Sequence, residues 1–446
     1  MKRVLIVVLG LAFAGINAQQ KWSLRECVDY AVKHNLQVIQ NEYSKQIQDS
    51  NLKIAQRNYL PSVNANVGNN VSFGQASLGT GSIRNDVFRN NANLSADILV
   101  YNNGKLEKTI RKTQFDVEAS QYDIETIQND ISLQIAQQYL TTLLNKEIVK
   151  ISQSATENAK KQLERAKITT EVGTTAQTVK AEAEAAWARE KQNLKTAEVN
   201  VGRSLFALAQ LLQLKDYKDF DIVDVEVSES LTPQLIAVED VLEKAYENQP
   251  QIKAALSRIK SAEAQTEVTK TSFWPTLTAS LGVGTFYNNL LNTNNVGNEF
   301  FYVKEGGFFN QYKDNFGQQG GVSLNIPIFN KGITKLQVEQ SKINENIAKT
   351  TLEQQKLTVR QNVQQAQFDA DANYEIYLAA TEAEKSTKLA MDFADKSYAA
   401  GRTTIFDLNI ARNNYANAQG SVQQAKFNYL FSLKLLNFYS GIPLSL

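Results

Sequence analysis

The stretch "SVNANVGNNVSF" at residues 62–73 alternates between two kinds of side chain, and it decides how the rest of the sequence is interpreted. One set is apolar or small and comprises Val63, Ala65, Val67, Val71 and Phe73. The residues between them are asparagine, serine and glycine. This period of two predicts a β-strand with one apolar face and one uncharged polar face. The surrounding sequence has the pattern of long helices, so the question is what each face of this strand contacts.

Three further stretches alternate in the same way: "LSADILVY" at 94–101, "TLTASLGVGTFY" at 276–287 and "VSLNIPIF" at 322–329. Four strands are too few to enclose a sizeable aqueous core. A transmembrane β-barrel explains both faces, because its outer side contacts lipid and its inner side lines water. Four strands cannot close a barrel, and open edges are not tolerated in lipid. Several copies must therefore share one barrel, with eight strands from two chains or twelve from three.

The chain contains two copies of one unit. Pro61 and Pro275, each of which ends a helix and starts a strand, are 214 positions apart. Two later glycine pairs, Gly104 with Gly332 and Gly173 with Gly401, are both 228 positions apart. A fixed order of such residues indicates a duplication, and the larger second spacing places an insertion of 14 residues in the second copy.

Each copy includes a very long helix. No proline or glycine occurs in 105–172 or in 333–400, and each 68-residue run would span about 100 Å as a helix. Five apolar side chains of the first run share one helix face: Ile124, Ile127, Ile131, Ile135 and Tyr139. Second helices are predicted at 177–214 and 405–438, so each copy forms a long antiparallel coiled-coil hairpin.

These boundaries predict five segments. Residues 1–18 have the basic start, apolar run and small residue of an export signal peptide. The first helix-strand-strand-helix repeat covers 19–214, and the second covers 238–439. A linker at 215–237 separates them, and a tail follows at 440–446. The long loop at 288–316 carries aromatic residues that suit a membrane-interface girdle, a pore plug or a plain surface loop.

Enzyme chemistry is not indicated. His34 is the only histidine and Cys27 the only cysteine, and no metal-binding, nucleotide-binding or nucleophile motif occurs. We expect Cys27 to be a packed core residue and His34 to lie on the surface. The balance of 47 lysines and arginines against 46 acidic residues gives no reason to expect nucleic acid. No cofactor or metal is predicted.

The order of these elements, from the export signal through the proline-started strands to the "EVGTT" and "AGRTT" helix tips, resembles the TolC-like outer membrane efflux proteins. The resemblance implies an α+β membrane protein: a homotrimer with a 12-stranded barrel in the outer membrane of a Gram-negative bacterium and a long helical tunnel through the periplasm. It implies an efflux or type I secretion channel that passively conducts substrates received from a periplasmic adaptor and an inner-membrane pump. The exported substrate, whether drug, metal ion or polypeptide, is not indicated.

The resemblance also implies a gate at the periplasmic end of the tunnel. The family's gate aspartate falls on Asp407, its latch tyrosine on Tyr398, and Arg402 lies beside the position of its latch arginine, which is Thr403 here. Two other family carboxylates fall on Ile410 and Val179, so a double acidic ring and the usual latch are not expected. Without the resemblance, the residues indicate that Asp407 is an ordinary solvated helix carboxylate.

The two helix tips are the predicted docking sites for the adaptor: Val172, Gly173, Thr174 and Thr175 in the first hairpin, and Gly401, Thr403 and Thr404 in the second. The glycines also end helices, whatever else the tips do. One alternative class remains open, an exported coiled-coil scaffold or adhesin without a pore. Its strands would pack on a partner, and it would need no detergent.

Overall fold

The computed structural model describes residues 21–78, 81–84, 86–225, 231, 237–291 and 307–442. The predicted signal peptide and the last four residues of the predicted tail lie outside these ranges. By its internal contacts the described chain divides into two compact units. One unit comprises residues 21–44, 120–255 and 351–442, and the other comprises 45–119 and 256–350.

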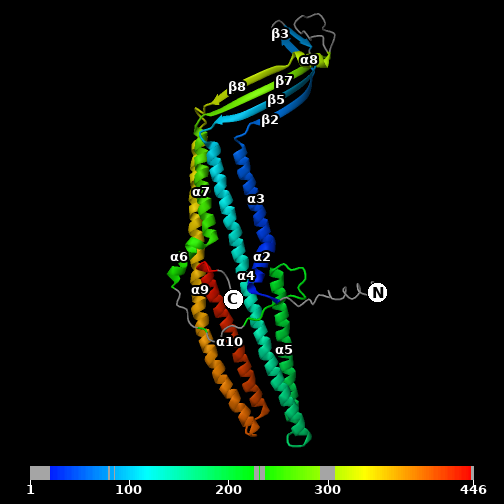
Figure 1. The fold of residues 1–446 in the computed structure, drawn as a ribbon, viewed down its shortest axis with the longest axis vertical. Coiled ribbons are helices and arrows are strands. Elements are labelled where there is room, and N and C mark those ends of the chain that lie inside the picture. Colours follow the sequence, from blue (N-terminus) through cyan, green and yellow to red (C-terminus); the bar gives the residue numbers. More distant parts are fainter. Residues whose placement is uncertain are drawn as a thin grey trace, which may run out of the picture. The chain divides into compact units, whose positions relative to one another are not determined.

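The two copies of the repeat have long helices of equal length (Figure 1). The long helices α4 (Lys105–Glu171) and α9 (Ile333–Ala399) both have 67 residues. The helices that follow them, α5 (Gln177–Leu211) and α10 (Ile405–Tyr439), both have 35. The predicted long antiparallel hairpins are confirmed, with helix ends within three residues of those expected from the sequence. The shorter helices are α2 (Leu24–His34), α3 (Leu36–Arg57), α6 (Val238–Asn248) and α7 (Pro250–Lys270).

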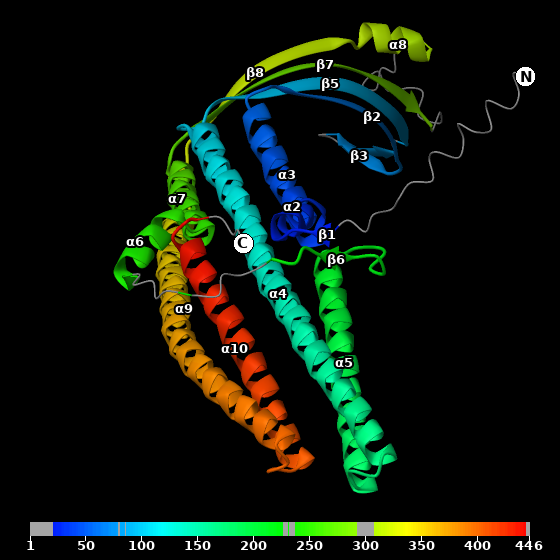
Figure 2. The ribbon, with the colours of Figure 1, turned by 60° about the horizontal axis from the view of Figure 1, so that its bottom comes forward.

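The four predicted strands form one antiparallel sheet in the order β2-β5-β7-β8. Their bounds are Ser62–Ser72, Val87–Tyr101, Thr276–Leu290 and Gly317–Asn325. Figure 2 shows that the sheet is strongly curved. Bends of this kind are what a sheet needs if it is to become part of a barrel.

The strand register confirms the two predicted faces. Val63 lies opposite Ala96, which in turn lies opposite Leu281. Ser62 lies opposite Asp97, an acidic residue on the polar face. Directly opposed residues of antiparallel strands point to the same side. Near Val63, Ala96 and Leu281 the sheet therefore has one apolar and one polar face. Farther along the strands the apolar side also carries Asn69 and Asn90, which are opposite each other.

The apolar face is not covered in the structure of one chain. Val67, Leu281 and Val322 are 70%, 68% and 71% exposed. The outer edges of β2 and β8 have no strand partner among the described residues. Both features are unfavourable in water, because they leave a large apolar patch and two rows of unpaired backbone groups.

Three strand predictions had wrong boundaries. The strand expected at 276–287 is β7, which continues to Leu290. The strand expected at 322–329 is β8, which starts at Gly317 and ends at Asn325, so Ile326–Phe329 lie outside it. The strand expected at 94–101 is the second half of β5, which begins at Val87. Within the described residues, Ile326–Phe329 pair with no strand, and Pro327 among them has no N–H to donate to one.

The loop expected at 288–316 contains a short helix, α8 (Phe308–Asp314). Its buried Gln311 side chain donates to the Asn288 carbonyl over 3.1 Å and accepts from the Asn288 N–H over 3.0 Å. Phe308 packs against Tyr287, at 5.2 Å between ring centres, on the same sheet face as Leu281. The possible roles of this loop as a girdle or a plug stay predictions. Phe300, Phe301 and Tyr302, also considered for these roles, lie outside the described residues.

The segment between β2 and β5 also contains regular structure. It forms a small hairpin of β3 (Gln75–Leu78) and β4 (Gly81–Arg84). Neither strand pairs with the four-stranded sheet.

The main core lies where the first hairpin meets α2. Its centre consists of fully buried side chains, namely Ile135, Tyr139, Leu208 and Cys27. The shared helix face predicted from the isoleucine spacing is confirmed, since Ile124, Ile131 and Ile135 are all buried. Burial, with a smaller effect from Glu26, raises the pKa of the Cys27 thiol to about 12, as expected for a packed structural cysteine. His34 is exposed, as predicted.

The linker is tied to this core by a short parallel pairing that the sequence did not reveal. In it, β6 (Asp221–Ile222) pairs with β1 (Lys21–Trp22). The ammonium group of Lys146 on α4 lies 2.7 Å from the Asp221 carboxylate and 2.9 Å from that of Asp224. A backbone bond and ion pairs therefore hold the start of the linker, although little in its composition predicts order.

The Tyr139 hydroxyl also connects α4 to the paired segments β1 and β6. It lies 3.2 Å from the Trp22 carbonyl and 3.1 Å from the Val223 carbonyl, and the side chain is fully buried. Tyr139→Phe should destabilise the protein by about 1–2 kcal/mol, because the one proton of this buried hydroxyl, which the two carbonyls share, is lost. The Trp22 carbonyl keeps a second donor, the Val223 N–H. Thermal unfolding followed by circular dichroism measures the loss of stability. Tyr246→Phe, which removes an exposed hydrogen bond with Arg360, is the matched control and should have almost no effect. Equal effects of the two variants would contradict the role given to Tyr139.

Candidate functional site

The two helix tips have the same backbone construction. Gly173 and Gly401 take left-handed φ values of 75° and 71°, which end α4 and α9. The Gly173 N–H donates to the Thr170 carbonyl over 3.1 Å, and the Gly401 N–H donates to the Tyr398 carbonyl over 2.9 Å. The duplication therefore extends to individual hydrogen bonds at both turns.

The first tip is held by threonine side chains. The Thr175 hydroxyl lies 3.0 Å from those of both Thr169 and Thr170, and the Thr174 hydroxyl donates to the Thr169 carbonyl over 2.8 Å. Val172 is 69% exposed at the end of the turn. An apolar side chain fixed in solvent by a rigid turn is suited to contact with another protein.

The second tip is held by a capping box that includes Asp407. The Asp407 carboxylate accepts from the Thr404 hydroxyl over 2.6 Å and from the Thr403 hydroxyl over 3.0 Å. In return, the Thr404 hydroxyl accepts from the Asp407 N–H over 3.2 Å. These bonds, with one from the Thr404 N–H, lower the pKa of Asp407, so this exposed carboxylate is ionised at neutral pH.

Sequence reasoning missed this capping role, although the threonine three residues before Asp407 is its usual signal. The first hairpin lacks the box. Its corresponding residues are Ala176, which makes no cap hydrogen bond, and Val179, which packs beside Leu163 and Ala183. The two tips therefore differ in chemistry at the one position where the second carries a negative charge.

Tyr398 and Arg402 flank the same turn. Tyr398 is half-buried and Arg402 is exposed. Across the described residues of this tip, no hydrogen bond or ion pair joins their side chains to each other or to Asp407. The fold thus brings the three predicted gate residues to one turn but does not link them.

The ion pair that does join the second hairpin lies further from the turn. An Nη atom of Arg412 on α10 lies 2.8 Å from the Asp395 carboxylate on α9. Its other terminal nitrogen is buried without a hydrogen-bond partner. Neither residue was singled out from the sequence, because an acidic and a basic residue 17 positions apart in sequence give no local signal.

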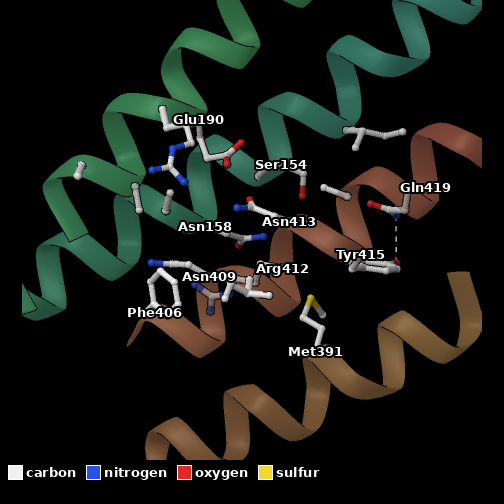
Figure 3. A pocket seen from close by; sticks show the side chains of 18 of the residues that line it. Ser154, Asn158, Glu190, Met391, Phe406, Asn409, Arg412, Asn413, Tyr415 and Gln419 are labelled. Carbon is white, nitrogen blue, oxygen red and sulfur yellow. Dashed lines mark hydrogen bonds between the residues drawn. The ribbon is translucent and has the colours of Figure 1, made fainter. Parts of the chain in front are cut away.

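A cavity of about 250 Å³ separates the two hairpins beside this ion pair. Figure 3 shows its polar lining, with Ser154 and Asn158 from α4, Glu190 from α5, and Asn409 and Asn413 from α10. Apolar side chains also line it, among them Phe406 from α10 and Met391 from α9. Further along, a second cavity of about 890 Å³ lies between α4, α5, α9 and α10. The two hairpins therefore do not meet here in a continuous close-packed core.

The described residues contain no cluster of three or more histidine, cysteine, aspartate or glutamate residues able to hold a metal ion. None of their helices combines the length and the apolar character needed to cross a membrane.

Comparison with solved structures identifies the fold. A membrane protein from Pseudomonas aeruginosa matches with a TM-score of 0.74 and 16% identity, covering 95% of this chain and 90% of that one. The CmeC outer membrane channel of Campylobacter jejuni matches with a TM-score of 0.72 and 20% identity, covering 94% of this chain and 85% of that one. Long helices with a small sheet are therefore the fold of known outer membrane channels.

Comparison by sequence gives the family. Outer membrane protein TolC of Escherichia coli is 27% identical over 315 residues, which is 70% of this chain and 60% of that protein. The model of the outer membrane efflux protein family matches residues 28–213 and 241–441, one segment for each copy of the repeat. This match confirms the predicted resemblance, the outer membrane location and the expectation that the protein is not an enzyme. The chain belongs to the outer membrane efflux protein family.

Proposed function

We propose that this protein is the outer membrane channel of an efflux or secretion system, and that it conducts substrates passively. Three copies would join their sheets into one 12-stranded barrel, and their hairpins would line a tunnel in the periplasm. The observation that carries the proposal is the four-stranded sheet, with its exposed apolar face and two open edges. In lipid, closure around a shared barrel satisfies both features together.

The helices also support an assembly of several copies. On α9, Leu336, Ile343 and Ile347 are 64%, 54% and 58% exposed. Their spacing of seven and four residues places them in one stripe along the helix. An apolar stripe on a long helix is the surface that a neighbouring helix covers in a bundle.

The tips are the proposed contact with a periplasmic adaptor, which in turn would join an inner-membrane pump. The exposed Val172 in one turn and the exposed Arg402 in the other supply an apolar and a charged contact. The left-handed glycines fix both turns, so a partner would meet a surface that needs little ordering.

Asp407 is proposed to form the constriction. Three copies around a symmetry axis would form a ring of ionised carboxylates, which attracts cations and repels anions. Asp407→Asn should keep the channel open to ions but reduce its preference for cations several-fold. The amide oxygen can still accept from Thr404, so the cap of α10 is retained.

The experiment is single-channel recording of detergent-purified protein in a planar lipid bilayer. Glu382→Gln, an exposed carboxylate on α9, is the matched control and should leave selectivity unchanged. Equal selectivity in wild type and Asp407→Asn would remove Asp407 from the constriction while keeping the channel. Protein that stays dispersed without detergent and gives no current steps would contradict the channel and favour a coiled-coil scaffold.

A further inference from the structure

The two copies of the repeat pair their own two strands in the same register, β2 with β5 in the first copy and β7 with β8 in the second. In the first copy, Ser62 on β2 lies opposite Asp97 on β5. Moving these positions by 214 and 228 residues gives Thr276 and Asn325, which lie opposite each other on β7 and β8. The two hairpins of the sheet are thus built to the same register, although they share few identical residues.

Within the sheet, the last strand of the first copy, β5, pairs with the first strand of the second copy, β7. The last strand of the second copy, β8, and the first strand of the first copy, β2, lie at opposite edges of the described sheet and do not pair. In the proposed trimer, β8 can pair with β2 only when the two strands belong to different chains. The register of this pairing between chains can be derived from that of β5 with β7, because β8 is the repeat of β5 and β2 is the repeat of β7.

We propose that β8 of one chain pairs antiparallel with β2 of the next in the register that β5 makes with β7. Asn91 lies opposite Phe286 within the chain, so Gln319 would lie opposite Ser72 of the next copy. One step along each strand on the same face, Gly321 would lie opposite Asn70. The inference rests on the proposed trimeric channel. It adds the residue-by-residue register of the pairing between β8 of one chain and β2 of the next, which we call the seam.

The faces of the sheet provide an independent check on this register. It places Leu324 opposite Val67 and Gly320 opposite Val71. On the same face, Val322 would lie opposite Asn69 and Gln318 opposite Phe73, so the match is apolar at the Leu324 end and mixed toward Gln318. A slip of one residue would place every apolar side chain of β2 beside a polar position of β8. Only slips by an even number of residues preserve the faces, and the slips of two in either direction are the nearest alternatives that an experiment must separate.

The seam also accounts for Ile326–Phe329, which lie outside β8. Their counterparts in the first copy, Ile98–Tyr101, belong to β5, where Ile98 pairs with Ala279 and Tyr101 with Leu277 of β7. In the structure of one chain, Ile328 and Phe329 are 93% and 85% exposed. The next copy would supply the missing partner at residues 63–65, so β8 would extend to Phe329 only in the assembly.

Cysteine cross-linking tests the register. Gln319 and Ser72 lie on the polar face, where water and an oxidant have access. Opposed residues of antiparallel strands have Cα atoms about 4.5–5.5 Å apart, which suits a disulfide. Oxidation of the Gln319→Cys, Ser72→Cys double variant should convert the protein into covalent trimers on a non-reducing gel. Within one chain these positions are three strands apart, about 14 Å, which a disulfide cannot bridge.

Two further double variants test the registers that are shifted by two residues in either direction. Gln319→Cys with Asn70→Cys, and Gln319→Cys with Gly74→Cys, each move the partner about 7 Å along the strand on the same face. Both should cross-link several-fold more slowly than the pair with Ser72. Each single cysteine variant, which also retains the buried Cys27, should give no cross-linked trimer.

Light scattering of the reduced proteins in detergent separates the possible failures. Trimers that cross-link fastest through Asn70 or Gly74 would overturn the register and leave the channel proposal intact. Trimers that cross-link through none of the three pairs would overturn the pairing of β8 with β2. Variants and wild type that are all monomeric would overturn the proposed trimer itself.

Discussion

Leu281→Lys should sharply reduce the amount of protein that assembles in a membrane. Leu281 lies on the apolar face of β7 and is 68% exposed in the structure of one chain, so lysine would be harmless there if this face met water. On the lipid side of a barrel, a lysine near the bilayer midplane costs about 2–4 kcal/mol, and the trimer would contain three. The measurements are the yield of trimer extracted from outer membranes and its resistance to heat in detergent.

Ser280→Lys is the matched control, since it places the same side chain one residue away on the polar face. There it would lie opposite Asp97, the acidic residue of that face, and should form an ion pair in water. Yield and heat resistance should stay close to those of wild type. Equal tolerance of lysine at both positions would show that the apolar face does not contact lipid, and the channel proposal would fail with it.

Leu208→Ala should destabilise the helical part by about 2–5 kcal/mol. Leu208 is fully buried in the core formed with Ile135 and Tyr139, and alanine would leave a cavity among long helices that cannot easily close around it. The free energy of unfolding, measured with guanidinium and circular dichroism, gives the effect. Its counterpart in the second copy, Leu436, is 1% exposed, and Leu436→Ala should be comparably destabilising.

Val199→Ala provides the comparison within the same helix. Val199 is 49% exposed, so it loses little burial, and its substitution should change the free energy of unfolding by well under about 1 kcal/mol. A Leu208→Ala variant as stable as Val199→Ala would contradict the assignment of this cluster as the main core.

The helices and the strand faces could be predicted because their signals are local. Gly173 and Gly401 end helices through a backbone conformation that other residues rarely adopt. Alternation of period two assigned Val63 and Leu281 to the same face of the sheet, and the register places them on one face. The duplication added support, since each signal occurs twice in the same order.

Features that depend on distant partners could not be predicted. The pairing of β6 with β1 joins residues about 200 positions apart, and its ion pairs with Lys146 follow from that fold. The end of β8 at Asn325 was misjudged because alternation continues through Ile328 while the strand partner does not. Alternation reports which face a residue would occupy, and pairing decides whether the strand forms.

For the candidate site, the sequence located the tips but not their internal bonds. Asp407, Tyr398 and Arg402 do lie at one turn, and their roles as a gate stay predictions. The capping of α10 by Asp407 shows that this residue also has a local structural function. The pairing of Arg412 with Asp395 was not anticipated, since only the antiparallel hairpin brings the two side chains together.

The open edges of the sheet have a genetic consequence. In the proposed trimer, the barrel closes only if β8 of each chain pairs with β2 of the next, at all three seams. One chain with a damaged β2 or β8 therefore prevents closure of a barrel that also contains two normal chains. A cell that makes equal amounts of sound and damaged chains would assemble only about one wholly sound trimer in eight by random mixing. Alleles that damage these edges yet still let the chain associate should therefore be dominant, and those that prevent association altogether should be recessive.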